Sequence, residues 1–160
     1  MESASGGLLW SSTIVRHGKG VAAEEDRIGA DILLHVSVST PIQIYSKGVL
    51  IQAKRTEPYQ HISQDRLDEL KVQCLKMLKH TPSAFVLSYS HQGLRAGPAT
   101  RFSGTNNRDI HRQCTWTSYR FFLELFRCPI GDPRITSGRV KELPVPNVIH
   151  LSAEGQVSSD

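Results

Sequence analysis

Few cysteines and the absence of any long apolar run set the first limits on this 160-residue sequence. The three cysteines, Cys74, Cys114 and Cys128, are an odd number without tight spacing, and no charged and apolar leader opens the chain. These features disfavour a secreted disulfide scaffold. Apolar runs such as VLI and AFVL are far shorter than the ~20 residues that cross a bilayer. We therefore expect a soluble, cytoplasmic protein that does not bind membranes.

Several common catalytic motifs are also missing. The segment RHGKG at 16–20 lacks the G-x4-G-K-[ST] pattern of a phosphate-binding loop, so nucleotide hydrolysis is not indicated. No G-x-S-x-G elbow marks a serine hydrolase. His111, Cys114 and Cys128 do not form the four tightly paired ligands that structural zinc requires.

The charge that is present is mildly basic. Lys and Arg number 19 against 15 Asp and Glu, which gives a net charge of +4. This balance modestly favours a polyanionic partner such as nucleic acid, although many ordinary soluble proteins share it. The length suits one domain with one core. Residues 1–7 are small and polar and predict a flexible lead-in, with a single domain over 8–160.

Hydrophobic periodicity predicts an α/β fold, in which helices pack on a mixed sheet that contains an antiparallel meander. Loosely helical spacing favours a first helix from Leu8, and strict alternation from Ala30 favours a strand. Ser63 is a suitable N-cap for a helix that extends to Lys79. Besides these, we expect strands at 42–45, 49–55, 83–90 and 145–151, a turn at 46–48, a functional loop at 92–108 and a helix at 119–126.

The stretch GVLIQAKR, residues 48–55, starts as a buried strand but ends with two polar side chains on one face. Gln52 and Lys54 lie roughly 7 Å apart on that face, because alternate residues of a strand project together. An unpaired ammonium is costly to bury, so an anionic partner is expected beside Lys54. Asp31 heads the neighbouring predicted strand, and the three side chains converge if the strands pair. Carboxylate, amide and carbonyl oxygens are the ligands that Mg²⁺ prefers.

This pattern carries a family resemblance. EEDRIGAD followed by GVLIQAKR resembles the active-site motif of the PD-(D/E)xK, or restriction endonuclease-like, nuclease superfamily. The nearest version is the Mrr-type branch, in which Gln replaces the second acidic residue. The resemblance covers residues 25–55 in detail, and the helix LDELKVQCLKM and the strand SAFVLSYS agree with the family's continuation to about Ser90.

The resemblance implies a role for each matching residue. Asp31 corresponds to the metal-binding aspartate, and Gln52 to the variant second ligand. Ala53 would contribute its carbonyl oxygen, and Lys54 would orient water and stabilise charge on the phosphate. Glu25 is similar to an extra helix glutamate that some members use as a ligand, and Glu24 competes for that role.

The function implied is Mg²⁺- or Mn²⁺-dependent hydrolysis of DNA, in a restriction or anti-phage defence effector. A double-strand cut needs two such sites, so a homodimer or higher oligomer is expected, and the chain is short enough to be the nuclease part of a longer effector. The alternatives are a Holliday-junction-resolving or repair nuclease, and a catalytically silent nucleic-acid-binding module. In a non-catalytic sheet, Lys54 would simply pair with Asp31 or with a helix carboxylate.

Further basic and polar residues could contact double-stranded DNA near such a site. A phosphate track is predicted from five cations, with a solvated basic surface as the alternative: Arg55, Lys19, Arg95, Arg101 and Arg108. Three lysines of the central helix could extend this track, but for them a solvated surface is favoured: Lys71, Lys76 and Lys79. His61 and Gln73 are candidates to reach the phosphate or the active-site water if the central helix crosses the sheet. The alternative for Gln73 is a buried amide with ordinary partners.

Overall fold

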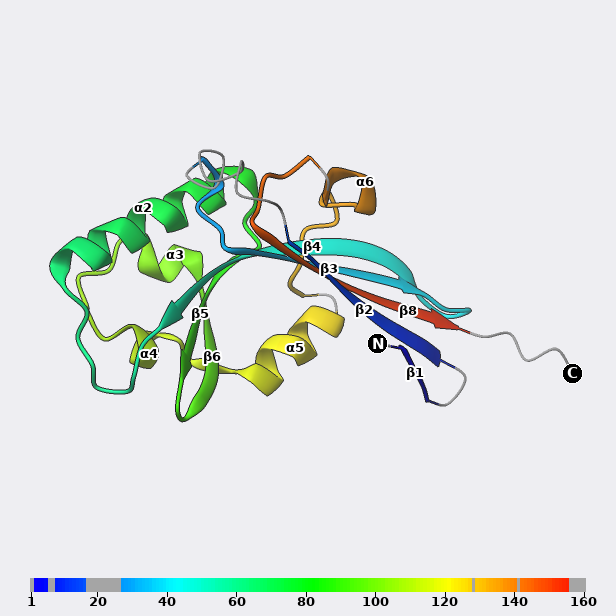
Figure 1. Ribbon diagram of the computed structural model, residues 1–160, viewed down its shortest axis with the longest axis horizontal. Helices are drawn as coiled ribbons and strands as arrows, with labels where there is room; N and C mark the ends of the chain where they lie inside the picture. Colours follow the sequence, from blue (N-terminus) through cyan, green and yellow to red (C-terminus); the bar gives the residue numbers. More distant parts are fainter. Residues whose placement is uncertain (1, 6–7, 17–26, 128, 141, 156–160) are drawn as a thin grey trace, which may run out of the picture.

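The computed structural model describes residues 2–5, 8–16, 27–127, 129–140 and 142–155. These residues form a mixed α/β fold with one eight-stranded sheet and helices on both of its faces (Figure 1). The strand order is β1-β2-β8-β3-β4-β5-β6-β7. Strand β3 runs parallel to β8, and β4 runs parallel to β5, whereas the other neighbouring pairs are antiparallel. The predicted mixed sheet with flanking helices is therefore confirmed.

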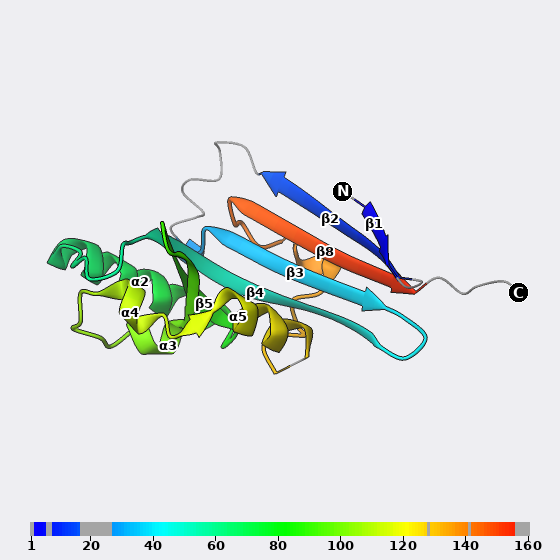
Figure 2. The same ribbon diagram turned by 90° about the horizontal axis from the view of Figure 1, so that it is seen from below.

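The order of the strands along the chain differs from their order in the sheet. Their bounds are β1 Glu2–Ser5, β2 Leu8–Arg16, β3 Ile32–Ser39, β4 Ile44–Arg55, β5 Ala84–Ser90, β6 Gly93–Pro98, β7 Trp116–Thr117 and β8 Asn147–Gly155. The last strand, β8, lies between β2 and β3, so the C-terminal part of the described chain joins the two halves of the sheet (Figure 2).

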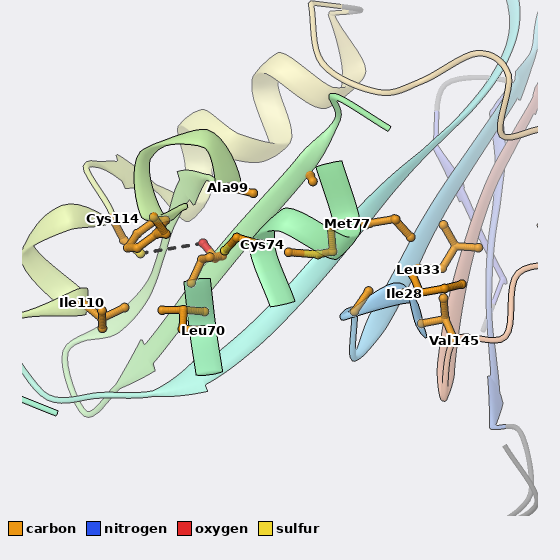
Figure 3. Close-up of a cluster of buried hydrophobic side chains, with 14 of the residues drawn as sticks. Ile28, Leu33, Leu70, Cys74, Met77, Ala99, Ile110, Cys114 and Val145 are labelled. Atoms are coloured by element: carbon orange, nitrogen blue, oxygen red, sulfur yellow. Dashed lines mark hydrogen bonds between the residues drawn. The ribbon is translucent and has the colours of Figure 1, made fainter. Parts of the chain in front are cut away.

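The helices divide between the two faces of the sheet. Their bounds are α2 Gln64–His80, α3 Ala99–Phe102, α4 Ile110–Gln113, α5 Ser118–Phe126 and α6 Ser137–Val140. Helices α2, α3 and α6 lie on one face and α5 on the other (Figure 1). Because strand residues alternate between faces, Leu50 of β4 joins the core under α2, while Val49 and Ile51 join the core under α5. Figure 3 shows the first core, in which Leu70, Cys74 and Met77 of α2 pack toward the sheet.

The N-terminal part of the chain corrects two expectations. Residues from Leu8 form strand β2 and no helix, and Glu2–Ser5 of the expected lead-in form the edge strand β1. Residues 8–16 pair along their whole length with β8, from Leu8 opposite Gly155 to Arg16 opposite Asn147. Backbone pairing with a strand so distant in sequence outweighs the loosely helical spacing of the apolar residues.

The expected meander is a single hairpin. Strand β4 is continuous from Ile44 to Arg55, so residues 46–48 lie within the strand, and the turn falls instead between Ser39 and Ile44. Gly48 serves close packing in this strand, since an added Cβ would overlap with Cγ2 of Ile135. Its backbone N–H and C=O pair with Asp132, a bridge that continues the edge of β4 before β5 begins.

The central helix matches its prediction closely. Ser63 is the N-cap of α2, and its hydroxyl accepts a hydrogen bond from the Arg66 N–H. Met77 is buried and Leu75 is half exposed, so the apolar stripe is displaced from the predicted one. Strand β5 is also confirmed, and the predicted loop at 92–108 instead contains β6 and α3.

The predicted helix at 119–126 exists, but its buried face differs from the predicted one. Phe121 and Leu125 are fully buried against the sheet, whereas Tyr119 is 75% exposed and Phe122 is 39% exposed. The last predicted strand is present as β8. In the described part of the chain, no helix has both the length and the apolar character to cross a membrane.

Candidate functional site

The predicted site residues lie where β4 extends beyond β3. The register of this hairpin ends with Ile32 opposite Ile51, whereas the pairing of β4 with β5 continues to Arg55. Within the described residues, 52–55 therefore pair with a strand, β5, along one edge only. The other edge is contacted by the residue that directly precedes β3.

Asp31 occupies that position and is held through its backbone on both sides. Its N–H donates to the Ile51 carbonyl at 2.9 Å, and its carbonyl accepts from Nδ2 of Asn147 at 3.1 Å. Gly29, two residues earlier, has φ +74°, and a Cβ there would lie 2.5 Å from the Gln73 carbonyl of α2. The tight approach to α2 therefore needs glycine.

The Asp31 carboxylate is bound by β4 itself. Its Oδ2 accepts hydrogen bonds from the Ala53 N–H at 2.9 Å and from Nε2 of Gln52. Gln52 is only 2% exposed, and its buried Oε1 has no hydrogen-bond partner among the described residues. An unsatisfied buried carbonyl costs about 1–3 kcal/mol. The predicted convergence of Asp31 and Gln52 is thus confirmed, with an amide oxygen available for one more interaction.

Lys54 lies on the same face as Gln52, toward α2, and lines a pocket of about 440 Å³. Within the described chain its ammonium makes no ion pair, so the simple Asp31–Lys54 pair expected of a non-catalytic sheet is not formed. Lys54 lies near the buried Cys74. Burial raises the pKa of the Cys74 thiol to about 12, and the positive charge of Lys54 acts in the opposite direction.

The wall opposite Lys54 contains residues that the sequence reasoning missed. Arg66 and Glu69 of α2 line the pocket together with Arg55. Gln73 lies one turn further on and donates to Oε1 of Glu69 at 3.4 Å, and its own buried Oε1 has no partner in the part of the chain that the structure describes. The spacing of Arg66, Glu69 and Gln73, i, i+3 and i+7, places them on one helix face and was the signal available in the sequence.

A buried hydrogen-bonded chain supports the end of β4. The Thr56 hydroxyl lies 2.7 Å from the Ser88 hydroxyl, which lies 2.8 Å from Nδ1 of His111. All three side chains are almost fully buried. Burial lowers the pKa of His111, and Arg95 acts in the same direction, while the Asp109 carboxylate opposes them. Thr56 lines the pocket, so the hydrogen bonds that join Thr56, Ser88 and His111 fix one wall beside Lys54.

The other predicted residues differ in where they lie. Arg95 is exposed on β6, and Arg101 donates to the Gln113 carbonyl and to the Thr115 hydroxyl. The Arg108 carbonyl accepts from the Ile62 N–H, which brings its loop beside the pocket, whereas the exposed His61 is not among the lining residues. Lys19, Glu24 and Glu25 lie outside the described residues.

Comparisons with known proteins add no identification. No family model matches the sequence, and neither curated proteins nor solved structures gave a significant match.

The oxygen atoms at the site fit a hard divalent cation. The Asp31 carboxylate and the partnerless Gln52 Oε1 are ligand types that Mg²⁺ and Mn²⁺ accept. Among the described residues no group of three His, Cys, Asp or Glu side chains forms a complete metal site. Further ligands would have to come from water, a substrate phosphate or residues outside the described ranges.

Proposed function

We propose that this chain is a metal-dependent nuclease of the restriction endonuclease-like fold that hydrolyses DNA phosphodiester bonds. The observation that carries the proposal is the arrangement at the end of β4. Asp31 and Gln52 are hydrogen-bonded, and on the same face of β4 the Lys54 ammonium lines a pocket without an ion-pair partner in the described chain. The assignment to the superfamily rests on the sequence resemblance, and so does a role in defence.

Each side chain has a defined task in this proposal. Asp31 and Gln52 would hold Mg²⁺ or Mn²⁺ through their oxygens, together with the Ala53 carbonyl. The ion, when bound, lowers the pKa of a coordinated water and offsets charge on the phosphate. The Lys54 ammonium stabilises negative charge that develops on the phosphate oxygens. Arg55 and Arg66, which line the same pocket, contact neighbouring phosphates of the DNA backbone.

Gln52 makes this site weaker than one with two carboxylates. Its Nε2 donates to Asp31, so the carboxylate is partly satisfied without an ion. One negative charge fewer lowers the intrinsic affinity for a divalent cation. We therefore expect tight metal binding only when a substrate phosphate supplies additional oxygen ligands.

The same hydrogen bond favours the second candidate function, a catalytically silent nucleic-acid-binding module. In that case Gln52 replaces the metal ion as the partner of Asp31. Arg55, Arg66 and Lys54 would bind phosphates without cleaving the chain.

Conversion of supercoiled plasmid tests the proposal. Purified protein is assayed in EDTA, Mg²⁺ and Mn²⁺ beside Asp31→Asn and Lys54→Met, which change charge but nearly preserve side-chain size. Lys71→Met is the matched control, because Lys71 is also on the α2 side of the molecule but binds Asn106 outside the pocket. Removing a charge that stabilises the transition state is expected to lower the rate by about 100-fold or more.

Metal-dependent nicking or linearisation, lost in both site variants and retained in Lys71→Met, is the expected result. Cleavage that survives Lys54→Met would refute the proposed role of the site. DNA binding without cleavage in any metal, unchanged by Asp31→Asn, would identify the silent module. Flap and four-way substrates in the same assay separate a general endonuclease from a repair or junction-resolving enzyme.

A further inference from the structure

A second, basic pocket lies far from the candidate active site. It has a volume of about 230 Å³. It is formed by the last turn of α2, by residues 132–135 between α5 and α6, and by α6 with the residues that follow it. Five of its lining residues are charged or titratable: Lys79, His80, Asp132, Arg134 and Arg139. Asp132 pairs with Gly48 through the backbone, and Lys54 lies roughly 20 Å further along β4 at ~3.3 Å per residue.

Asp132 is the organising residue of this pocket. Its side chain is 4% exposed and accepts from the Thr81 hydroxyl at 2.8 Å. It also accepts from Nε of Arg134 at 3.0 Å and from Nη2 of Arg134 at 2.8 Å. The backbone bridge to Gly48 fixes Asp132 to the sheet. The guanidinium of Arg134 is therefore held in one orientation by a rigid support.

This support leaves donors available at the mouth of the pocket. Arg134 is 66% exposed, and in the described residues its Nη1 has no hydrogen-bond partner. Lys79 and Arg139 likewise form no ion pair with any described residue. Among the described lining residues Asp132 is the only acid, and its charge is already matched by Arg134. These described residues together carry a net charge of about +2 when His80 is neutral.

We propose that this pocket binds a phosphate group. A fixed guanidinium with free N–H donors, next to a second arginine and a lysine, matches the charge and the geometry of a phosphate. The pocket volume of about 230 Å³ is many times the ~10–15 Å³ that one water molecule requires, which is room for a phosphate with part of its attached group. The phosphate comes either from a nucleic-acid backbone or from a small phosphorylated ligand.

The proposal does not depend on the proposed nuclease activity. The two sites share no lining residue, and they lie at opposite ends of α2. All binding measurements are therefore made in a Lys54→Met background, so that phosphate captured by the candidate active site does not contribute.

Titration with inorganic pyrophosphate at constant ionic strength, followed by calorimetry, is the first measurement. Arg139→Gln is compared with Arg127→Gln, which removes the same charge from the end of α5 outside the pocket. Arg139→Lys keeps the charge. Loss of one charge-assisted contact is expected to weaken binding about tenfold or more in Arg139→Gln, with little change in Arg127→Gln and partial retention in Arg139→Lys.

A mononucleotide with a 5′-phosphate and an oligonucleotide without terminal phosphates then identify the source. Binding of the mononucleotide that depends on Arg139 indicates a small phosphorylated ligand, and Arg139-dependent binding of the oligonucleotide indicates a nucleic-acid backbone. Equal weakening by Arg139→Gln and Arg127→Gln would reduce the effect to net charge and overturn the proposal. So would the absence of binding by all three probes at millimolar concentration.

Discussion

Replacing Gln52 with Glu tests the geometry of the candidate site most directly. Nε2 of Gln52 donates to Oδ2 of Asp31, and the side chain of Gln52 is 2% exposed. Gln52→Glu replaces this donor with a second carboxylate of similar size. Two charges ~4 Å apart repel each other by about 4 kcal/mol at an effective dielectric constant of ~20. Partial protonation of the pair limits the loss, so we expect destabilisation by about 2–4 kcal/mol at neutral pH.

Thermal unfolding in EDTA measures this loss. A chain of this length loses roughly 2–4 °C of Tm per kcal/mol, which predicts a decrease of about 5–15 °C for Gln52→Glu. The folded pair binds a proton more tightly than the same groups in the unfolded chain. The deficit relative to the parent is therefore smallest at low pH and grows as pH rises through the pKa of the pair.

Divalent metal is expected to reverse the loss. An ion bound only by the folded protein adds about 2.7 kcal/mol at 100 times its Kd, and the second carboxylate strengthens the site. Mg²⁺ should therefore raise the Tm of Gln52→Glu more than that of the parent or of the exposed control Gln92→Glu. An unchanged Tm in EDTA would show that the side chains at 31 and 52 are not in contact. A decrease that metal does not reverse would refute the metal site alone.

Two further predictions concern buried polar groups outside this pair. Ser88→Ala leaves Nδ1 of His111 without its partner and should cost about 1–3 kcal/mol in chemical denaturation, whereas the same change at the less buried Ser90 should cost much less. Hydrogen bonds from Arg134 lower the pKa of Asp132 to about 2. Asp132 therefore contributes about 2 kcal/mol to the free energy of unfolding above pH 4, and this contribution is lost as the pH falls toward 2. Asp132→Asn should remove that pH dependence, whereas the control Asp68→Asn should leave it intact. The measurement is the free energy of unfolding as the pH is lowered. If both variants behaved alike, the pH dependence would not come from Asp132.

Local signals in the sequence were sufficient for the part of the fold that carries the site. The N-cap at Ser63 and the short apolar run of β5 are encoded within a few residues, and both were found in the structure. The helix α2 was found too, although its buried stripe includes Met77 and leaves Leu75 half exposed. The alternation in 48–55 also correctly placed Gln52 and Lys54 on one face. These features depend on residues that are close together in the sequence.

Long-range pairing is what the sequence did not reveal. Strand β2 was predicted as a helix because its partner β8 is more than a hundred residues away, and the apolar residues of 8–16 have no strict alternation. Arg66 and Glu69 were missed for a related reason. Their polar face on α2 is unremarkable until the helix is packed across β4, and only then do they form a wall of the pocket with Lys54.

The position of the site follows from a mismatch in strand length. Strand β4 extends past the start of β3 but is still paired with β5 as far as Arg55, so the Ala53 N–H at its other edge lacks a strand partner. Such an unpaired backbone donor must be satisfied in a buried sheet. The Asp31 carboxylate satisfies it, and this contact brings a charged oxygen to the same end of β4 as Gln52 and Lys54. The geometry therefore requires an acceptor at position 31 whether or not the chain is catalytic. The group whose charge needs a functional explanation is Lys54, which forms no ion pair with any described residue.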